Sequence, residues 1–245
     1  MTRRRWIADE WNDRSAILRN AQAAHLARVL RARPGQQFDI VAGDAVRRGV
    51  IEKVREDAVE FSLHEEIEAA PSLPLFIGMS VIRFERMEWA IEKLTELGVV
   101  QIVPLLAQRT EKHLAQAAAR RVERWRKIAR ESAQQSRRND VPQIADPLDL
   151  PQWLQENHDG LRIVLSETER DQSLQAALDV RPSISPGLEP KDMTAAVGPE
   201  GGWTEQELTR FTEHGWQSVS LGPRILRAET AAIAVASVVN ATLGW

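Results

Sequence analysis

Apolar and polar positions follow two different patterns before and after residue 70. Three β-rich runs at hairpin spacing occupy residues 37–41, 46–54 and 58–63. From Leu75 onward, short apolar runs alternate with amphipathic ones, which is typical of an α/β layer architecture. We therefore expect a small β module, as a barrel or curled sheet with one helix, followed by an α/β domain with candidate strands at residues 75–82, 101–105, 161–165, 194–197 and 217–221.

Helical spacing predicts the elements between these strands. Asn20 is expected to cap a helix over residues 21–31 that is ended by Pro34-Gly35, with Ala24, Val29 and Leu30 facing inward. One apolar face belongs to a helix that ends at Gly98 as a C-cap, and a second lies on the helix that carries a cluster of basic residues. These two faces consist of Met87, Ala90 or Ile91, Leu94 and Leu97, and of Val122, Trp125, Ala129 and Ala133.

Two further helices follow near the carboxyl end. Thr204 with Glu207 three residues on predicts a capping box at the start of one of them. Residues 231–243 are apolar on nearly every side, which predicts a last helix buried against the sheet or a partner subunit. Residues 69–74 contain two prolines and indicate a domain boundary, whereas residues 181–191 contain three prolines and predict an irregular loop.

Composition excludes several classes of protein. The chain has no cysteine among its 245 residues, so disulfides, thiolate metal sites and cysteine nucleophiles are absent. The five histidines are scattered without ligand spacing, and we expect no metal site. Neither a secretory signal nor a membrane-length apolar run is present, which favours a soluble cytoplasmic protein without a membrane partner.

Two Gly-Pro loops, at residues 198–202 and 222–227, each follow an apolar run and lead into a helix. Backbone N–H groups and the helix dipole are presented at such turns, so two close together predict one composite pocket. The spacing fits neither a dinucleotide fingerprint nor a P-loop, which argues against a nucleoside triphosphate. An apolar slot with free backbone groups suits a flat heterocycle such as adenine, and a pair of purely structural turns is the alternative.

The sequence around these loops, VGPEGGWTEQEL followed by LGPRILRAETAAIA, resembles the signature of the RsmE family. These are bacterial methyltransferases of the SPOUT superfamily that modify N3 of a uridine in 16S ribosomal RNA. Further segments resemble the same family in the same order, which makes coincidence improbable. They are residues 25–31 ahead of Pro34-Gly35, residues 92–99, 102–104 and 108–110, and residues 134–142.

The resemblance implies a PUA-like RNA-binding β-barrel domain at residues 1–70. It implies a SPOUT α/β domain at residues 75–245, with a parallel sheet, flanking helices and a carboxyl-terminal trefoil knot that binds S-adenosylmethionine. It further implies a homodimer, and 16S rRNA or the small ribosomal subunit as the partner. The cofactor-binding residues would then be Leu165, Gly198, Pro199, Glu200, Gly201, Gly202, Leu221, Gly222, Ile225 and Leu226.

The chemistry of N3 methylation suggests catalytic candidates. The lone pair of N3 becomes available only when its proton leaves, so a base must accept the proton or a cation must stabilise the anion. Arg227 and Arg138 are candidates for the cation, and Glu200 or Glu229 for the base. The alternatives are structural, because either glutamate suits a helix N-terminus and Arg227 could be a buried ion-pair partner of Glu229.

Basic residues suggest where RNA binds. Residues 119–138 hold eight basic side chains and two acidic ones, although the formal net charge of the chain is only -3. At spacings i, i+4 and i+7, Arg120, Arg124 and Lys127 would form one stripe that meets phosphates. Arg3, Arg4 and Arg5 would form a second patch on the barrel. The alternative is an ordinary solvated helix face.

Two other functions remain open. Related ribose 2′-O methyltransferases tend to carry Ser-Leu-Asn where this chain has residues 227–230, RAET, which argues against that reaction. A non-catalytic RNA-binding or ribosome-assembly factor with the same fold would not bind S-adenosylmethionine, so calorimetry separates it from an enzyme.

Overall fold

A computed structural model of the chain describes residues 5–43, 45–68, 72–156, 160–179 and 193–243. The chain divides into two compact units, of which the first is Met1–Pro71 with Glu131–Val141 and the second is Ser72–Arg130 with Pro142–Trp245. The sequence had suggested one domain over residues 75–245, but the structure groups residues 131–141 with the first unit. Among the described residues, no helix combines the length and the apolar content needed to cross a membrane.

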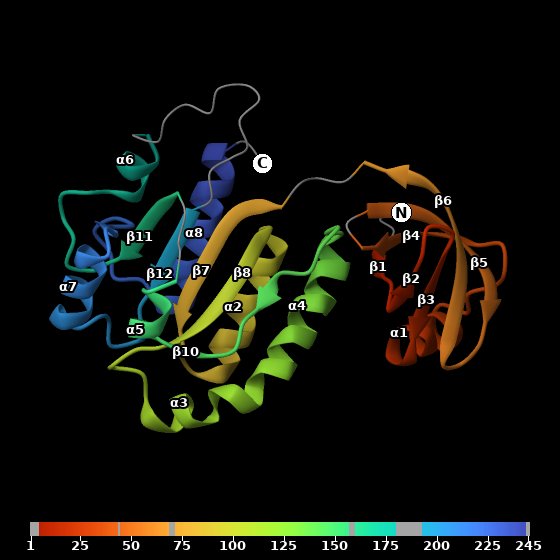
Figure 1. Cartoon of the computed structure of the whole chain (residues 1–245), viewed down its shortest axis with the longest axis horizontal. Coiled ribbons are helices and arrows are strands. Elements are labelled where there is room, and N and C mark those ends of the chain that lie inside the picture. The colour runs from red at the N-terminus through yellow and green to blue at the C-terminus, as the bar shows by residue number, and fades with distance from the viewer. Residues whose placement is uncertain (1–4, 44, 69–71, 157–159, 180–192, 244–245) are drawn as a thin grey trace. The chain divides into compact units, whose positions relative to one another are not determined.

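The first unit is a six-stranded sheet in the order β1-β4-β5-β6-β3-β2 (Figure 1). Only β1 and β4 pair in parallel, and the other neighbours are antiparallel. The three predicted runs are confirmed as β4, β5 and β6, whereas β1, β2 and β3 were not predicted. The strands are β1 (Arg5–Ile7), β2 (Glu10–Trp11), β3 (Ser15–Arg19), β4 (Gln37–Ala42), β5 (Ala45–Val54) and β6 (Ala58–Ile67).

The helix of this unit differs from its prediction. Helix α1 (Asn20–Ala24) continues as a π-helix (His25–Val29), in which Leu30 N donates to His25 O at 3.1 Å. Arg19 is the N-cap, and Asn20 lies inside the helix with φ 47° and makes no capping hydrogen bond. The wider π turn rotates the following residues, so Val29 and Leu30 are 65% and 49% exposed and the inward-facing residues are Ala23 and Leu26.

Two apolar clusters hold the first unit together. The larger one places Trp6, Leu18 and Phe61 beneath α1. In the smaller one, Ile7, Val41, Val46 and Ala133 are buried together, with Val141 packed against them. The end of α4 (Val122–Ser136) and the residues up to Val141 therefore belong to this unit through side-chain packing.

The second unit contains a seven-stranded parallel sheet in the order β10-β8-β7-β12-β11-β13, with β9 beside β8 (Figure 1). All five predicted strands are confirmed, as β7, β8, β11, β12 and β13. Two short strands, β9 and β10, were not predicted. The bounds are β7 (Leu73–Ser80), β8 (Val99–Leu106), β9 (Gln143–Ile144), β10 (Leu148–Asp149), β11 (Leu161–Leu165), β12 (Met193–Val197) and β13 (Gln217–Val219).

Helices cover the sheet as the α/β pattern predicts. On one face of the sheet, α8 packs against α2, β7 and β12. On the other face, α5 and α7 contribute Trp153 and Phe211 to an apolar cluster that also contains Trp216. Gly78 of β7 lies under Trp153, where a Cβ atom would come within 2.3 Å of the ring. The helices are α2 (Phe84–Glu96), α3 (Lys112–Ala118), a 3-10 turn (Ala119–Arg121), α4, α5 (Leu150–Trp153), α6 (Leu174–Asp179), α7 (Glu205–Glu213) and α8 (Ala228–Leu243).

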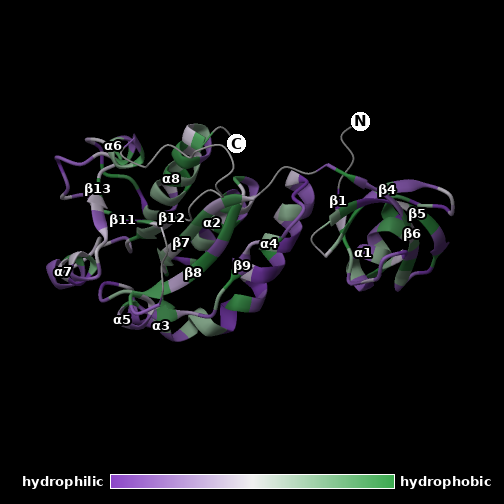
Figure 2. Cartoon of the chain, turned by 45° about the horizontal axis from the view of Figure 1, so that its top comes forward, coloured by the Kyte–Doolittle hydropathy of each residue, from purple (hydrophilic) through white to green (hydrophobic). Residues whose placement is uncertain are grey.

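Most helix faces match their predictions. Met87, Ala90, Ile91 and Leu94 are buried, and α2 ends at Glu96 with Leu97 as its C-cap, one residue before Gly98, whose φ is 91°. The predicted face of α4 is fully buried, and Figure 2 shows apolar and polar positions alternating along this helix. Helix α8 is an exception, because only one of its faces is buried within the chain while Ser237 and Ala241 are exposed.

Candidate functional site

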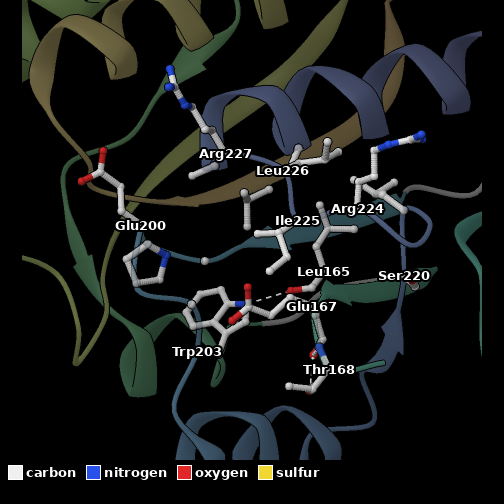
Figure 3. A pocket seen from close by; sticks show the side chains of 18 of the residues that line it. Leu165, Glu167, Thr168, Glu200, Trp203, Ser220, Arg224, Ile225, Leu226 and Arg227 are labelled. Atoms are coloured by element: carbon white, nitrogen blue, oxygen red, sulfur yellow. Dashed lines mark hydrogen bonds between the residues drawn. The ribbon is translucent and has the colours of Figure 1, made fainter. Parts of the chain in front are cut away.

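A cavity of about 420 Å³ opens where β11, β12 and β13 end. The carboxyl ends of neighbouring parallel strands meet at one edge of a sheet, which is where α/β proteins usually bind their ligands. Three loops build it, namely residues 166–170, 198–203 and 220–227, together with residues 83–86 at the start of α2 (Figure 3). The two Gly-Pro loops therefore share one pocket, as the sequence predicted.

Tight packing fixes the first Gly-Pro loop. The Trp203 indole Nε1 donates to Leu165 O at 3.1 Å, and the ring packs edge-on against Phe211. A Cβ atom on Gly198 would lie 3.2 Å from the Trp203 ring, and one on Gly202 would lie 2.9 Å from Glu167 Oε1. Gly202 also has φ 69° and donates to Pro199 O at 2.8 Å. Both glycines are thus required by close approach or by backbone conformation.

The second Gly-Pro loop supplies an apolar wall. Ile225 is 79% exposed, an unusual state for a large aliphatic side chain, and with Leu221 and Leu226 it lines the cavity. Within the described residues, the N–H groups of Ile225 and Leu226 make no hydrogen bond. An apolar slot with free amide donors matches the edge and faces of adenine, so the residues present fit the adenosyl part of S-adenosylmethionine.

One arginine connects the acidic groups beside the cavity. Arg86 of α2 places Nη1 2.7 Å from Glu200 Oε1 and Nε 3.7 Å from Glu229 Oε1. Glu229 lies in the first turn of α8 with a side chain only 6% exposed, and its Oε2 has no hydrogen-bond partner among the described residues. Arg86 thereby links the first Gly-Pro loop to the start of α8.

Comparison with known proteins adds to this geometry. A model of the RNA methyltransferase domain matches residues 69–240 of the chain. The ribosomal RNA small subunit methyltransferase E of Bacillus subtilis is 32% identical over 222 residues, covering 88% of this chain and 86% of that protein. The protein of the same name from Aquifex aeolicus is 29% identical over 237 residues, covering 95% and 97%.

A protein of the same name is also among the solved structures that resemble this chain. It is the ribosomal RNA small subunit methyltransferase E of Neisseria gonorrhoeae bound to S-adenosyl methionine, which is 27% identical, with a TM-score of 0.82 and 98% of each chain covered. This chain belongs to the ribosomal RNA small subunit methyltransferase E family. The resemblance seen in the Gly-Pro loops is thereby confirmed.

Nine of the ten residues expected to bind the cofactor line the cavity of this family member. Gly201 does not line it, because it turns toward Arg109, whose Nη1 donates to Gly201 O at 2.7 Å. The sequence analysis missed Arg83 and Arg86, and at the end of β11 it named Leu165 but not the following Ser166, Glu167 and Thr168. The position of these three residues directly after a predicted strand of the sheet was the available signal.

The catalytic candidates separate into two groups. Glu200 and Arg227 line the cavity, and Arg227 O accepts from Ala231 N at 2.8 Å, so Arg227 directly precedes α8. The suggested ion pair of Arg227 with Glu229 is wrong, because Arg86 takes that place and the exposed Arg227 has no ion pair among the described residues. Glu229 is not among the residues that line the cavity, although it lies in the first turn of α8 directly after them.

Arg138 lies outside this cavity. It is grouped with the first unit, and its buried guanidinium binds Asp140 through Nε at 3.0 Å and Nη2 at 2.6 Å. Bidentate pairing of this kind fixes the side chain. The proposed role of Arg138 in catalysis stays a prediction.

The residues expected to bind RNA differ in exposure and in the elements on which they lie. Arg3 and Arg4 lie outside the described residues. Arg5 is half-buried and donates from Nη1 to Arg137 O, and desolvation lowers the pKa of its guanidinium. Arg120 lies in the 3-10 turn directly before α4, which carries Arg124 and Lys127, so the stripe of these three residues stays a prediction.

Arg124 on α4 is already paired. Its guanidinium binds Glu88 of α2 through two hydrogen bonds of 2.5 and 2.7 Å. Lys127 is exposed on the same helix. No cluster of three or more histidine or acidic side chains that could hold a metal ion occurs within the part of the chain that the structure describes.

Proposed function

We propose that this protein transfers the methyl group of S-adenosylmethionine to N3 of a uridine in 16S rRNA of the small ribosomal subunit. The observation that carries the proposal is the composite cavity, in which two Gly-Pro loops present an apolar slot and free amide donors at the ends of parallel strands. Membership of the methyltransferase E family supports the same cofactor and substrate.

Finer features of the fold belong to the same proposal. The first unit would be a PUA-like barrel that binds RNA, and the segment after β13 would form a trefoil knot. In support of the knot, α8 returns from the edge strand β13 to pack against the inner strands β7 and β12. The homodimer belongs to the proposal too, and a partner subunit would cover the partly exposed Ile233 and Val238 of α8. We expect the enzyme to act in the cytoplasm, where ribosomes are assembled.

The residues of the cavity divide the chemical work. The bound cofactor supplies an electrophilic methyl group to the uridine. We assign stabilisation of the developing uridine anion to Arg227, because its exposed guanidinium stands at the cavity without an ion-pair partner among the described residues. Glu200 lines the cavity and is our candidate for the proton acceptor, whereas Glu229 holds Arg86.

Two experiments test the proposed function. Titration of the pure protein with S-adenosylmethionine in a calorimeter should show stoichiometric binding, and a non-catalytic assembly factor predicts none. Nucleosides from 16S rRNA of a strain lacking the gene should lose 3-methyluridine, which returns when the gene is restored. Loss of a 2′-O-methylated nucleoside instead would identify the ribose methyltransferase alternative.

A further inference from the structure

Arginines from three separate segments converge on the cavity. Arg83 and Arg86 flank the start of α2, and Arg170, Arg224 and Arg227 belong to the loops after β11 and β13. The same lining contains two acidic residues, Glu167 and Glu200. The rim of the cavity, which we define as these five arginines, therefore carries more positive charge than its own carboxylates neutralise.

The five arginines of the rim differ in whether they form ion pairs. Arg86 is bound to Glu200, and Arg83 is 67% exposed with Nε 3.9 Å from the other oxygen of Glu200. Arg170, Arg224 and Arg227 are exposed, and none of them forms an ion pair or a side-chain hydrogen bond with a described residue. Three guanidinium groups thus remain available for an anionic ligand.

The loops that carry the available arginines are fixed to each other. Glu169 accepts hydrogen bonds from Asp171 N at 2.7 Å and Gln172 N at 3.0 Å, which shapes the turn around Arg170. Ser220 N donates to Gln172 O at 2.8 Å and joins this turn to the second Gly-Pro loop. Arg170 and Arg224 are therefore held on one frame rather than on independent tails.

The guanidinium groups of Arg224 and Arg227 face outward from the cofactor slot. Figure 3 shows the side chains of Arg224 and Arg227 pointing away from Trp203, which lies against Leu165. A ligand that meets them must therefore extend beyond the slot. An extended polyanion such as a single RNA strand presents phosphates at regular spacing, and arginine binds phosphate with paired hydrogen bonds.

We propose that Arg170 and Arg224 bind phosphate groups of the RNA strand that carries the target uridine. This inference rests on the proposed function, because it requires RNA at the same cavity. It locates the RNA path at the rim of the cavity, in place of the stripe suggested on α4.

Salt dependence of RNA binding tests the proposal. Filter binding of transcribed 16S rRNA, without cofactor, is measured over a range of salt concentrations for wild type, Arg170→Ala, Arg224→Ala and the double variant. Each lost phosphate contact should reduce the slope of log affinity against log salt by about 0.7, so the double variant should lose about 1.4. Arg210→Ala removes one exposed charge from α7 and should leave the slope unchanged.

Three outcomes would overturn the proposal. An unchanged slope in the Arg170→Ala/Arg224→Ala variant would show that RNA does not contact the rim. A loss of slope confined to an Arg120→Ala/Lys127→Ala variant would move the RNA path to the region of α4. A loss of S-adenosylmethionine affinity in calorimetry, with the RNA slope intact, would show that these arginines serve the cofactor.

The same experiment separates this inference from the proposed function. The binding assay contains no cofactor and measures no methylation, so an inactive wild-type protein would still report its RNA contacts. Conversely, a wild-type protein that forms 3-methyluridine while the rim variants bind RNA normally would retain the proposed function and reject the RNA path. Circular dichroism of each variant checks that the fold is intact.

Discussion

Helix α4 and the cavity rim are both rich in arginine, but two arginines on α4 have acidic partners whereas three on the rim have none among the described residues. On α4, Arg124 is bound to Glu88, and Arg126 is bound to Glu123 and Asp146. Arg121, just before the helix, lies over the Phe84 ring with its Cζ 4.6 Å from the centroid. On the rim, Arg170, Arg224 and Arg227 have no such partner among the described residues. The number of arginines in a segment therefore says little about how many can bind a ligand.

Geometry explains the difference. A helix places residues i and i+3 side by side, so Glu123 reaches Arg126, and packing against α2 brings Glu88 to Arg124. Arg170, Arg224 and Arg227 lie on loops instead, and the nearby Glu200 is already bound to Arg86. Charges that remain unpaired at a cavity are the ones that can attract an anionic substrate.

Arg227→Ala should give the largest effect. Removing the cation that stabilises the uridine anion should lower the rate of methylation about 100- to 1000-fold. Single-turnover assays with saturating S-adenosylmethionine measure this rate, and calorimetry should show nearly unchanged cofactor affinity. Arg124→Ala is the matched control on α4. Equal losses in the two variants would abolish the distinction between rim and helix.

Arg86→Ala should give the largest loss of stability. Glu229 would be left buried without its cation, which typically costs about 3 kcal/mol, reduced here because Arg86 is 32% exposed. Urea denaturation measures the free energy of unfolding. Glu229→Gln in the Arg86→Ala background should recover much of the loss, whereas Glu200→Gln should recover less because Glu200 is 31% exposed. Equal recovery by both would contradict the assignment.

Local patterns in the sequence predicted much of this fold. The central strands, the buried faces of α2 and α4, and the capping box of Thr204 with Glu207 follow from residues close in the chain. Most of the cofactor loops followed from two Gly-Pro turns and their resemblance to a family. These features are local because backbone conformation and helical period depend on neighbouring residues.

Other features depend on residues far apart in the chain. Arg86 and Glu200 are 114 positions apart, and Arg124 and Glu88 are 36 apart, so no short pattern contains either pair. The π-helix after α1 involves only neighbouring residues, but each of its turns holds more residues than a turn of an α-helix. Val29 and Leu30 are therefore exposed, although the α-helical period predicted that they are buried. Long-range pairing and a change of helical period are therefore what the sequence analysis missed.

The Arg124–Glu88 pair should contribute much less than the Arg86 network. Arg124 is 60% exposed, and exposed ion pairs typically stabilise a protein by about 0.5 kcal/mol. A double-mutant cycle with Arg124→Ala and Glu88→Gln, measured by urea denaturation at low and high salt, gives the coupling energy. Coupling above about 2 kcal/mol, or coupling that salt does not reduce, would place α4 with the buried network.

Glu169→Gln should give the smallest effect, and one that depends on pH. Hydrogen bonds from the N–H groups of Gln172 and Asp171 lower the pKa of Glu169 below its ordinary value of 4.5. Because the folded-state pKa is the lower one, the carboxylate stabilises the turn fully above pH 4.5, and this stabilisation is lost as pH falls through the folded-state pKa. Melting temperatures of wild type and Glu169→Gln should therefore differ slightly at neutral pH and converge in acid. A difference that persists or grows in acid would mean that Glu169 does not hold the turn around Arg170 through its charge, and that the frame of the rim depends on backbone contacts alone.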